Sequence, residues 1–599
     1  MFPFPSQDID SLILSLFSQI PVLIGTAAIY HTLIGFTLVS AANFTACKNT
    51  IESKLHSKNA TVRLEIEPIL WPTNAPITHF RYDNTRRPLL VTTDGCIKEC
   101  GQSPDIHSVN DAFQVLTTWV LPMLALVAQL PFESLSKYKR QNLWALMAWI
   151  GSPATTLAAT IWNIYVIREC AKKAAEDNNE PCRRDVYYVL SCLNQYEYPL
   201  PLPDWDIQGQ NHQVLNNTTP GWHIRDQALF YGLCVPLQRG NTAAQHRAEA
   251  QWMIQELAYQ LRMNRRRAVL PLSLSLIWFY VSFVISIVIA FEDLGDNTTA
   301  HSLALGLLLS WLPSLVLVTI IDRNPITATR CKVLIERWLY NCDKLLHDND
   351  KRWTEGDHNF IVGDFIGQGR YPGYRGVGIT VLHWMEDNRI TPNGVDMGPD
   401  HRMDDNKHNK FMRQCISRPW AWVRRWLVGL FIQSVGVGMA FLVSFNTPIV
   451  GLGCRTFLYL LYYLFSLGPW LLEAFLRDQS RYRSVPLYVN RFCSTAAALL
   501  LPLIMFFQVF NALNSCYCKA SVLGTKNYGG YVDFENAQYY KGAFNIMEYW
   551  APAAVSGLLT SFGVLCWVVA KWSRCRTLWS QREDHYLQGG NNYVLTWIV

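Results

Sequence analysis

The sequence predicts an all-α fold: a polytopic membrane helix bundle of eight spans plus one re-entrant or interfacial segment, with two mixed cytoplasmic segments. Three observations predict this fold. Only 16% of the 599 residues are charged, whereas about a quarter of a soluble chain is charged. Eight stretches stay apolar over a length that can cross a bilayer. Clusters of Lys and Arg flank these stretches on alternate sides.

Each predicted span has the length that a membrane requires. A helix rises about 1.5 Å per residue, so about 20 apolar residues cross a hydrocarbon layer of roughly 30 Å. Residues 1–10 are acidic and lack a basic start, so the first stretch is predicted to be a span and not a cleavable signal. The eight predicted spans are residues 21–41, 112–132, 268–291, 301–321, 426–445, 456–475, 492–513 and 549–570.

A ninth apolar stretch, residues 143–167, is interrupted by Gly151, Ser152 and Pro153. Proline breaks a helix because its ring clashes with the preceding turn and its nitrogen carries no hydrogen. Basic residues flank the stretch on both sides, so both flanks are expected on the cytoplasmic face. We therefore predict a re-entrant or interfacial pair of short helices hinged at this tripeptide.

Positive residues fix the orientation of the C-terminal half. Arg265 to Arg267 precede the span at 268, Arg424 and Arg425 precede the span at 426, and Lys571 follows the last span. Positive flanks stay cytoplasmic, so both termini are predicted inside. Loops 292–300, 446–455 and 514–548 are then outside.

A rival topology makes residues 143–167 a true span, places the N-terminus outside and puts loop 43–111 inside. Sequons at Asn43, Asn59 and Asn297 argue against it, because glycosylation occurs on the lumenal side. The eight-span topology also places an even number of cysteines outside, as disulfides in an oxidising compartment require. These disulfide candidates are Cys47, Cys96, Cys100, Cys454, Cys516 and Cys518.

The spans divide the chain into membrane and aqueous regions. In the cytoplasmic segments, Ile254, Leu257, Ala258 and Leu261 recur at helical spacing, so this helix is expected to lie against the spans or the lipid. The predicted regions are an N-terminal membrane region of residues 1–167 with a lumenal loop 43–111, a cytoplasmic segment 168–267, a membrane hairpin 268–321, a cytoplasmic segment 322–425, a four-span region 426–570 and a tail 571–599.

Composition and motifs exclude several functions. The net charge of +6 gives no basic excess, so no nucleic-acid partner is expected. The Gly-rich loop 363–378 lacks the Lys and Ser or Thr of a P-loop, so no nucleotide cofactor is expected. The polar run 401–410 lacks the spacing of a zinc motif and is interpreted as a solvated loop, so no metal is predicted either.

Ionisable residues inside spans are costly and are therefore candidates for function. His31 lies in the middle of the first span and Glu473 near the inner end of the sixth, while Asp322 lies at a span end. Each is a candidate catalytic group. A hydrogen-bonded packing role explains His31 and Glu473 more simply, as does snorkelling to the interface for Glu473, and a role as helix cap or anchor explains Asp322 more simply. The aromatic residues expected to form a substrate pocket beside Glu473 are Trp470, Tyr459, Tyr462 and Tyr463.

Residues 130–164, 296–325 and 444–461 resemble a largely uncharacterised family of multi-pass integral membrane proteins of filamentous fungi. Some members are encoded in secondary-metabolite gene clusters. The resemblance covers most of the membrane region and neither cytoplasmic segment, and it supplies no catalytic motif. It implies a fungal endoplasmic reticulum or plasma membrane, and a neighbourhood of enzymes acting on prenylated or polyketide intermediates.

Three functions fit these observations. The first is a membrane-embedded terpene cyclase, in which a carboxylic acid such as Glu473 protonates a prenyl epoxide and aromatic faces stabilise the cation. The second is a transporter or exporter of a secondary metabolite, which the scarcity of charges in the spans and the absence of a repeat disfavour. The third is a membrane scaffold or signalling protein. The expected partners are the lipid bilayer and, for the first two, a lipophilic small molecule.

Overall fold

The structure is a computed structural model of the chain. The described residues are 42–57, 59, 61, 65–70, 89–106, 108–130, 139–176, 181–196, 228–229, 231–237, 244–263, 269–292, 297–321, 328–346, 376, 378–379, 381–382, 385, 419–447, 451–476, 484–520, 530–534 and 544–579.

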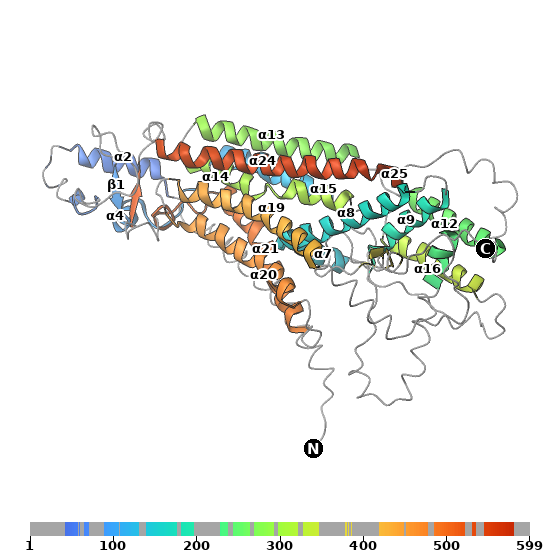
Figure 1. Ribbon diagram of the computed structural model, residues 1–599. Coiled ribbons are helices and arrows are strands. Elements are labelled where there is room, and N and C mark those ends of the chain that lie inside the picture. The colour runs from blue at the N-terminus through green and yellow to red at the C-terminus, as the bar shows by residue number, and fades with distance from the viewer. Residues whose placement is uncertain are drawn as a thin grey trace, which may run out of the picture.

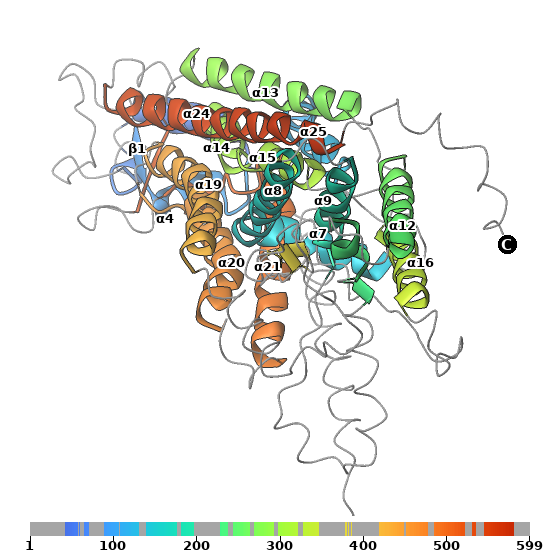
Figure 2. The same ribbon diagram turned by 45° about the vertical axis from the view of Figure 1, so that its right-hand side comes forward.

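The middle of the molecule is a bundle of long apolar helices, with a small disulfide-bonded region at one end and a second helical region at the other (Figure 1). Both views show the same order of regions along the bundle (Figure 2). The bundle helices are α13 (Val269–Glu292), α14 (Asn297–Leu308), α15 (Leu312–Ile321), α19 (Pro419–Phe445), α20 (Cys454–Leu476), α21 (Ser484–Val509) and α24 (Phe544–Arg574).

Five helices of the described chain are long and apolar enough to cross a membrane: Leu270–Glu292, Thr299–Thr319, Val423–Phe445, Tyr488–Val509 and Met547–Arg574. They coincide with five of the eight predicted spans, so the prediction of an integral membrane helix bundle is confirmed at this coarser level.

The other three predicted spans are not among these five candidate spans. Predicted span 456–475 is α20, and predicted span 112–132 corresponds to α5 (Val109–Val115), a π-helical turn and α6 (Leu121–Val127). Both are helical, but α20 is not among the five candidate spans and Ala112–Val127 is a shorter apolar helix. Predicted span 21–41 lies outside the described residues.

Exposure separates the helices that face lipid from those that form the centre. In α13 the exposed residues Leu270, Leu274, Ile277, Val281 and Ile285 form one stripe at helical spacing. By contrast, nearly all residues of the span Thr299–Thr319, which covers most of α14 and α15, are buried. An apolar helix that is buried all round lies at the centre of a bundle, so α14 and α15 form its axis.

The interrupted segment 143–167 forms two helices, α7 (Lys139–Gly151) and α8 (Pro153–Ala175), as the Gly-Ser-Pro sequence predicts. The second helix is longer than the predicted short one and continues beyond Ile167. Along α8, Ala154 to Ile161 is buried in the bundle, whereas Cys170 is buried in the neighbouring helical region. The helix therefore begins inside the bundle and leaves it at the end opposite the disulfides.

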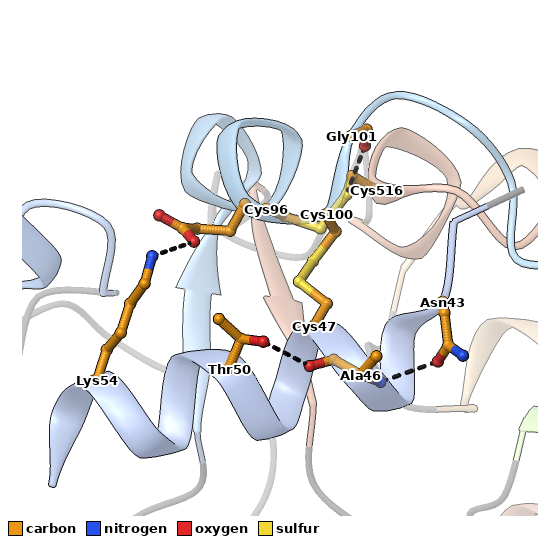
Figure 3. The surroundings of a disulfide bond; sticks show 10 residues. Asn43, Ala46, Cys47, Thr50, Lys54, Cys96, Cys100, Gly101 and Cys516 are labelled. Atoms are coloured by element: carbon orange, nitrogen blue, oxygen red, sulfur yellow. Dashed lines mark hydrogen bonds and ion pairs between the residues drawn. A yellow bond between two sulfur atoms is a disulfide. The ribbon is translucent and has the colours of Figure 1, made fainter. Parts of the chain in front are cut away.

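The disulfide-bonded region, which we call the cap, is built from two distant segments of the chain. Its strands β1 (Leu90–Thr92) and β2 (Tyr531–Asp533) pair antiparallel, with Val91 opposite Val532. Around them lie α2 (Phe44–Leu55), α4 (Thr93–Cys100) and α22 (Cys516–Lys519). Three disulfides hold these elements, namely Cys47–Cys100, Cys96–Cys516 and Cys454–Cys518. Figure 3 shows the first two.

We call the helical region at the other end the thiol domain, because seven cysteines of its core occur as thiols. Residues from both predicted cytoplasmic segments share this core. The expectation that the helix containing Ile254 and Leu257 lies against the spans or lipid is wrong, since both side chains are buried between helices of this domain. Its elements are the end of α8, α9 (Pro181–Leu193), η4 (Val235–Leu237), α12 (Ala244–Met263), α16 (Ala328–Leu346) and α25 (Arg576–Trp579).

Candidate functional site

The break between α7 and α8 replaces one helical hydrogen bond with two side chains. In a continuous helix the N–H of Ala154 would donate to the carbonyl of Ile150. Here the Ala154 N–H donates to Gln433 Oε1 at 3.0 Å, and the Ile150 carbonyl accepts from the Tyr462 hydroxyl at 3.1 Å. Both backbone groups are therefore satisfied inside the bundle, as irregular backbone at membrane depth requires.

A polar network continues from this break into α20. Gln433 Nε2 donates to Ser466 Oγ, which donates in turn to the carbonyl of Tyr463 at 2.8 Å. Ser152, the residue at the break, directs its hydroxyl to the carbonyl of Ser466 at 3.4 Å. Ser152, Gln433 and Ser466 are all buried, and all three are uncharged.

A second break lies between α14 and α15, at residues 309–311, and the sequence analysis did not predict it. Pro313 at the start of α15 has no N–H, and Leu312 N–H bonds instead to the Leu309 carbonyl at 2.9 Å. The Ser310 carbonyl accepts from Ser561 Oγ of α24 at 2.7 Å. Ser561 also bonds to the Tyr280 hydroxyl at 2.9 Å, so side chains again satisfy the interrupted helix.

Both breaks lie against the same face of α19. Gly429, Gln433 and Gly436 recur at i, i+4 and i+7, which is one face of a helix. A Cβ atom on Gly429 would lie 2.4 Å from the Ala154 carbonyl oxygen, and one on Gly436 would lie 2.5 Å from Ser310 Oγ. The glycines therefore allow the two broken helices to approach α19, at levels about 10 Å apart along its axis. Helices α8 and α15 also pack against each other.

Each of the two half-helices carries a buried hydroxyl at its third residue. Thr155 Oγ1 in α8 and Ser314 Oγ in α15 have no hydrogen-bond partner within the described residues of the chain. Thr155 is 5% exposed and Ser314 is fully buried. A buried polar atom without a partner costs about 1–3 kcal/mol, so these two hydroxyls require an explanation.

The four aromatic residues predicted to form one pocket all lie on α20, but their polar atoms have separate partners. Tyr462 bonds to Ile150, Tyr463 bonds to Ser434 Oγ at 2.7 Å, and the Tyr459 hydroxyl accepts from Gln508 Nε2. Trp470 stacks on Trp426 with ring centroids 3.5 Å apart. Only Tyr462 and Tyr463 are connected to the α7–α8 break. That the four side chains line one substrate pocket stays a prediction.

The side chains of the three predicted catalytic residues are not among the described parts of the chain. His31 and Asp322 lie outside the described residues. Glu473 belongs to α20, one turn after Trp470, and its side chain also lies outside the described portion of the chain. Their catalytic roles stay predictions.

The predicted modification sites have different surroundings. Asn43 and Asn59 are exposed; Asn43 caps α2 by accepting from Ala46 N–H at 2.8 Å, and Asn59 accepts from the Thr61 hydroxyl at 2.8 Å. Asn297 begins α14, and its side chain lies outside the described portion. The six cysteines assigned to the outside are the six that form the three disulfides of the cap.

Sequence reasoning missed a second polar cluster where the bundle meets the cap. Arg455 Nη1 lies 2.7 Å from His301 Nδ1, and Arg455 Nη2 donates to Asn511 Oδ1 at 3.1 Å. Asn511 Nδ2 donates in turn to the carbonyl of Asp105 at 3.0 Å. The sequence analysis considered Asp322 at a span end but overlooked His301 at the start of one predicted span and Arg455 just before another.

Comparison with known proteins adds no further assignment. Among the described residues, no group of three or more His, Cys, Asp or Glu side chains is arranged to hold a metal ion. No family model, curated protein or solved structure matches the chain.

Proposed function

We propose that the protein is a membrane-embedded carrier for a neutral, lipophilic small molecule that binds where the two helix breaks meet α19. The observation that carries this proposal is the matched position of Thr155 and Ser314, each at the third residue of a half-helix that begins inside the bundle. Interrupted helices with buried N-termini form the substrate sites of many transporters.

The chemistry of the two breaks favours an uncharged cargo. The residues that surround them are Ser152, Gln433, Ser466, Ser310 and Ser561, which offer hydroxyl and amide groups and no charge. The N-terminus of each half-helix adds a partial positive charge and favours a ligand oxygen. A hydroxyl or carbonyl group of an otherwise apolar molecule would pair with such a site.

The two orphan hydroxyls supply the ligand contacts in this proposal. A buried hydroxyl that lacks a protein partner gains one when a ligand oxygen arrives, so its desolvation cost is recovered on binding. The glycines at 429 and 436 keep the backbones of three helices close to this place. From the sequence, the scarcity of charges in the spans and the absence of a repeat disfavoured the carrier hypothesis, whereas the two helix breaks support it.

The carrier function requires a topology, for which we retain the eight-span arrangement with both termini in the cytoplasm. The cap, with its exposed Asn43 and Asn59 and its three disulfides, would then face the lumen or the outside. The thiol domain would face the cytosol. Helices α7 and α8 would form the re-entrant segment, since α8 leaves the bundle at the thiol end.

A membrane-embedded cyclase is the second candidate, because Glu473 follows Trp470 by one turn on the helix that carries Tyr462 and Tyr463. In that mechanism the carboxylic acid of Glu473 protonates the oxirane of a prenyl epoxide. His31 and Asp322 would be auxiliary acid or base groups. The scattered partners of the four aromatic residues give this mechanism less support than the two breaks give a carrier.

A deletion strain complemented with variants separates the two functions. We expect Thr155→Val with Ser314→Ala to leave protein abundance unchanged and to retain the finished metabolite inside cells. If the protein is a carrier, Glu473→Gln should not change export. If it is a cyclase, cells with Glu473→Gln should accumulate the uncyclised precursor and lose product on the order of 100-fold.

Two buried hydroxyl groups that donate to backbone carbonyls of their own helix provide the matched control. Thr160 Oγ1 donates to the Thr156 carbonyl at 2.8 Å, and Ser286 Oγ donates to the Phe283 carbonyl at 3.0 Å. Thr160→Val with Ser286→Ala removes the same atoms from similarly buried sites, so export should be normal. Full export by the Thr155 and Ser314 variant would contradict the proposed site.

A further inference from the structure

We infer that Arg168, Lys571 and Arg574 form a binding site for the headgroup of an anionic phospholipid where the bundle meets the thiol domain. Lys571 and Arg574 belong to the last turns of α24, and Arg168 belongs to α8. Arg168 and Arg574 are exposed and Lys571 is half-buried. We call these three residues the basic cluster. The inference goes beyond the proposed carrier function and does not depend on it.

Folding brings the basic cluster together from two distant parts of the chain. Helices α8 and α24 contact each other, and the sequence neighbours Ile167 and Cys575 are buried in the same apolar core. The charges of Arg168 and Arg574 both act on Lys571. In both views the C-terminal end of α24 reaches the thiol domain (Figures 1 and 2). Three positive charges therefore lie at one place on the surface.

Acidic side chains of the neighbouring helices have other basic partners. Glu169 lies on a different side of α8 from Arg168, because adjacent residues of a helix do not face each other, and its charge acts on Arg425. Asp185 of α9 pairs with Arg262, and Glu176 pairs with two other basic residues. Within the described parts of the chain, no ion pair involves the basic cluster. Like charges held close together repel, so an anion from outside the chain would stabilise this arrangement.

The basic cluster lies at the end of a lipid-facing surface. Leu559, Phe562 and Val569 are exposed apolar residues that share one side of α24. Trp567 is also exposed, and Lys571 Nζ lies 5.9 Å from the centroid of its ring. Tryptophan is enriched where a membrane meets water. The surface of α24 thus changes from apolar to cationic within about one turn, as a bilayer changes from acyl chains to headgroups.

An anionic phospholipid matches both parts of this surface. Its acyl chains would cover the exposed apolar side chains of α24, and its headgroup would lie against the basic cluster. Phosphatidylcholine carries a choline cation that the cluster repels, so a headgroup with net negative charge is favoured. Each Lys or Arg near the membrane surface strengthens binding of anionic lipid about fivefold. A soluble anion would contact the charges alone and would bind more weakly.

Native mass spectrometry can identify the retained lipid. The full chain is released from nanodiscs that contain equal amounts of phosphatidylglycerol and phosphatidylcholine. We expect the wild type to retain phosphatidylglycerol at least about tenfold more often. Arg168→Gln, Lys571→Gln and Arg574→Gln should each lower this preference about two- to fivefold, and the triple variant should have none. Equal retention of the two lipids by the wild type, or an unchanged preference in the triple variant, would overturn the inference.

Matched variants separate the basic cluster from general surface charge. Lys98→Gln changes an exposed residue of the cap, and Arg247→Gln changes a half-buried residue about 22 Å along α12 from Arg262. Both should keep the wild-type preference. Arg168→Lys keeps the charge of the cluster and should also keep it, which distinguishes a lost charge from a damaged fold. A loss in Arg247→Gln as large as that in Lys571→Gln would refute the site.

A competition experiment separates a lipid site from a site for a soluble phosphate. Glycerol phosphate, added in an amount equal to that of phosphatidylglycerol, should not displace the lipid, because it cannot cover the apolar side chains of α24. Displacement would show that the site takes a soluble anion and would overturn the assignment to a lipid. Neither experiment contains a cargo, so the lipid site and the carrier function can fail separately.

Discussion

The cap and the thiol domain lie at opposite ends of the bundle and use cysteine in opposite ways (Figure 1). In the cap, all six described cysteines are joined in disulfides. In the thiol domain, seven buried cysteines occur as thiols. Disulfides persist in oxidising compartments and are rare in the cytosol, so this distribution supports the proposal that the two ends face different compartments.

The two regions also differ in how much apolar core stabilises them. The described cap core consists of ten buried residues, whereas 32 buried residues make up that of the thiol domain. A small region buries too little surface to offset its conformational entropy and usually needs covalent links. The larger thiol domain is stabilised by its apolar core and by an ion pair between Arg262 and Asp185. The guanidinium group of Arg262 also lies over the Tyr188 ring. Disulfides therefore occur in the region whose apolar core is too small to stabilise it alone.

The largest expected effect is on the ion pair of the thiol domain. Arg262→Met leaves Asp185 buried without its main partner and should destabilise that domain by about 3–5 kcal/mol. Thermal unfolding followed by proteolysis of residues 244–263 measures the change, and added reductant should not alter it. Arg262→Met with Asp185→Leu should recover some of the loss, because no buried charge remains. An unaltered unfolding temperature in Arg262→Met would show that the pair contributes little.

The disulfide between Cys96 and Cys516 should matter slightly less, at about 2–4 kcal/mol. It joins α4 to α22 across 420 residues, so Cys96→Ala with Cys516→Ala should loosen both halves of the cap. We expect protease to cut within residues 42–57 of the cap at lower temperature, while cutting within the thiol domain is unchanged. Cys234→Ala, in the thiol domain, is the control. Equal protease resistance of the double variant and wild type would mean that the apolar cap core suffices.

Thiol reactivity should be low and should depend on pH in a defined direction. Burial raises the pKa of the Cys234 thiol from 9.0 to about 12, and burial also raises the pKa of Cys331 and Cys342. Only the thiolate reacts with iodoacetamide. In native protein at neutral pH we expect Cys234 to be alkylated at least about tenfold more slowly than after unfolding, as measured by mass spectrometry. Rapid native alkylation of Cys234 would indicate an open domain.

The same shift makes the thiol domain less stable in alkali. A group whose pKa is raised on folding stabilises the folded form while it is protonated. For Cys234 this contribution is present below pH 9.0 and is lost progressively as pH rises toward about 12. Denaturant unfolding of Cys234→Ala should show a smaller loss of stability over this range.

Substitution of the sequon asparagines should have the smallest effect on stability. Glycosylation at these residues would show that the cap faces the lumen or the outside. Asn43→Gln with Asn59→Gln should abolish the shift in mobility that peptide glycosidase causes at these sites. Stability should change by only about 1 kcal/mol, because both side chains are exposed and the main loss is the hydrogen bond with which Asn43 caps α2. Cleavage of the cap by a protease confined to the cytosolic side would overturn the eight-span topology.

Apolar runs and helix-breaking residues, which act over short stretches of the chain, made much of this fold predictable. Apolar runs of span length identified the five candidate spans, and Gly151, Ser152 and Pro153 located the first break, since a missing N–H acts within one turn. The second break at residues 309–311 was missed because Pro313 lies inside an otherwise uniform apolar run. Gln433 was missed because the search considered ionisable residues, whereas an amide satisfies an interrupted backbone without a charge.

By itself the sequence determined that the protein is a helical membrane bundle and that six particular cysteines are suited to disulfides. Which cysteines pair was decided only by the tertiary structure, because six cysteines allow fifteen connectivities. The tertiary structure likewise brought Ala154 and Ser310, at the two helix breaks, beside one face of α19, and His301 to Arg455. The physical reason is that hydropathy and helix breaking depend on neighbours along the chain, whereas disulfides, buried hydroxyls without a partner and the Arg455 cluster depend on residues that folding brings together.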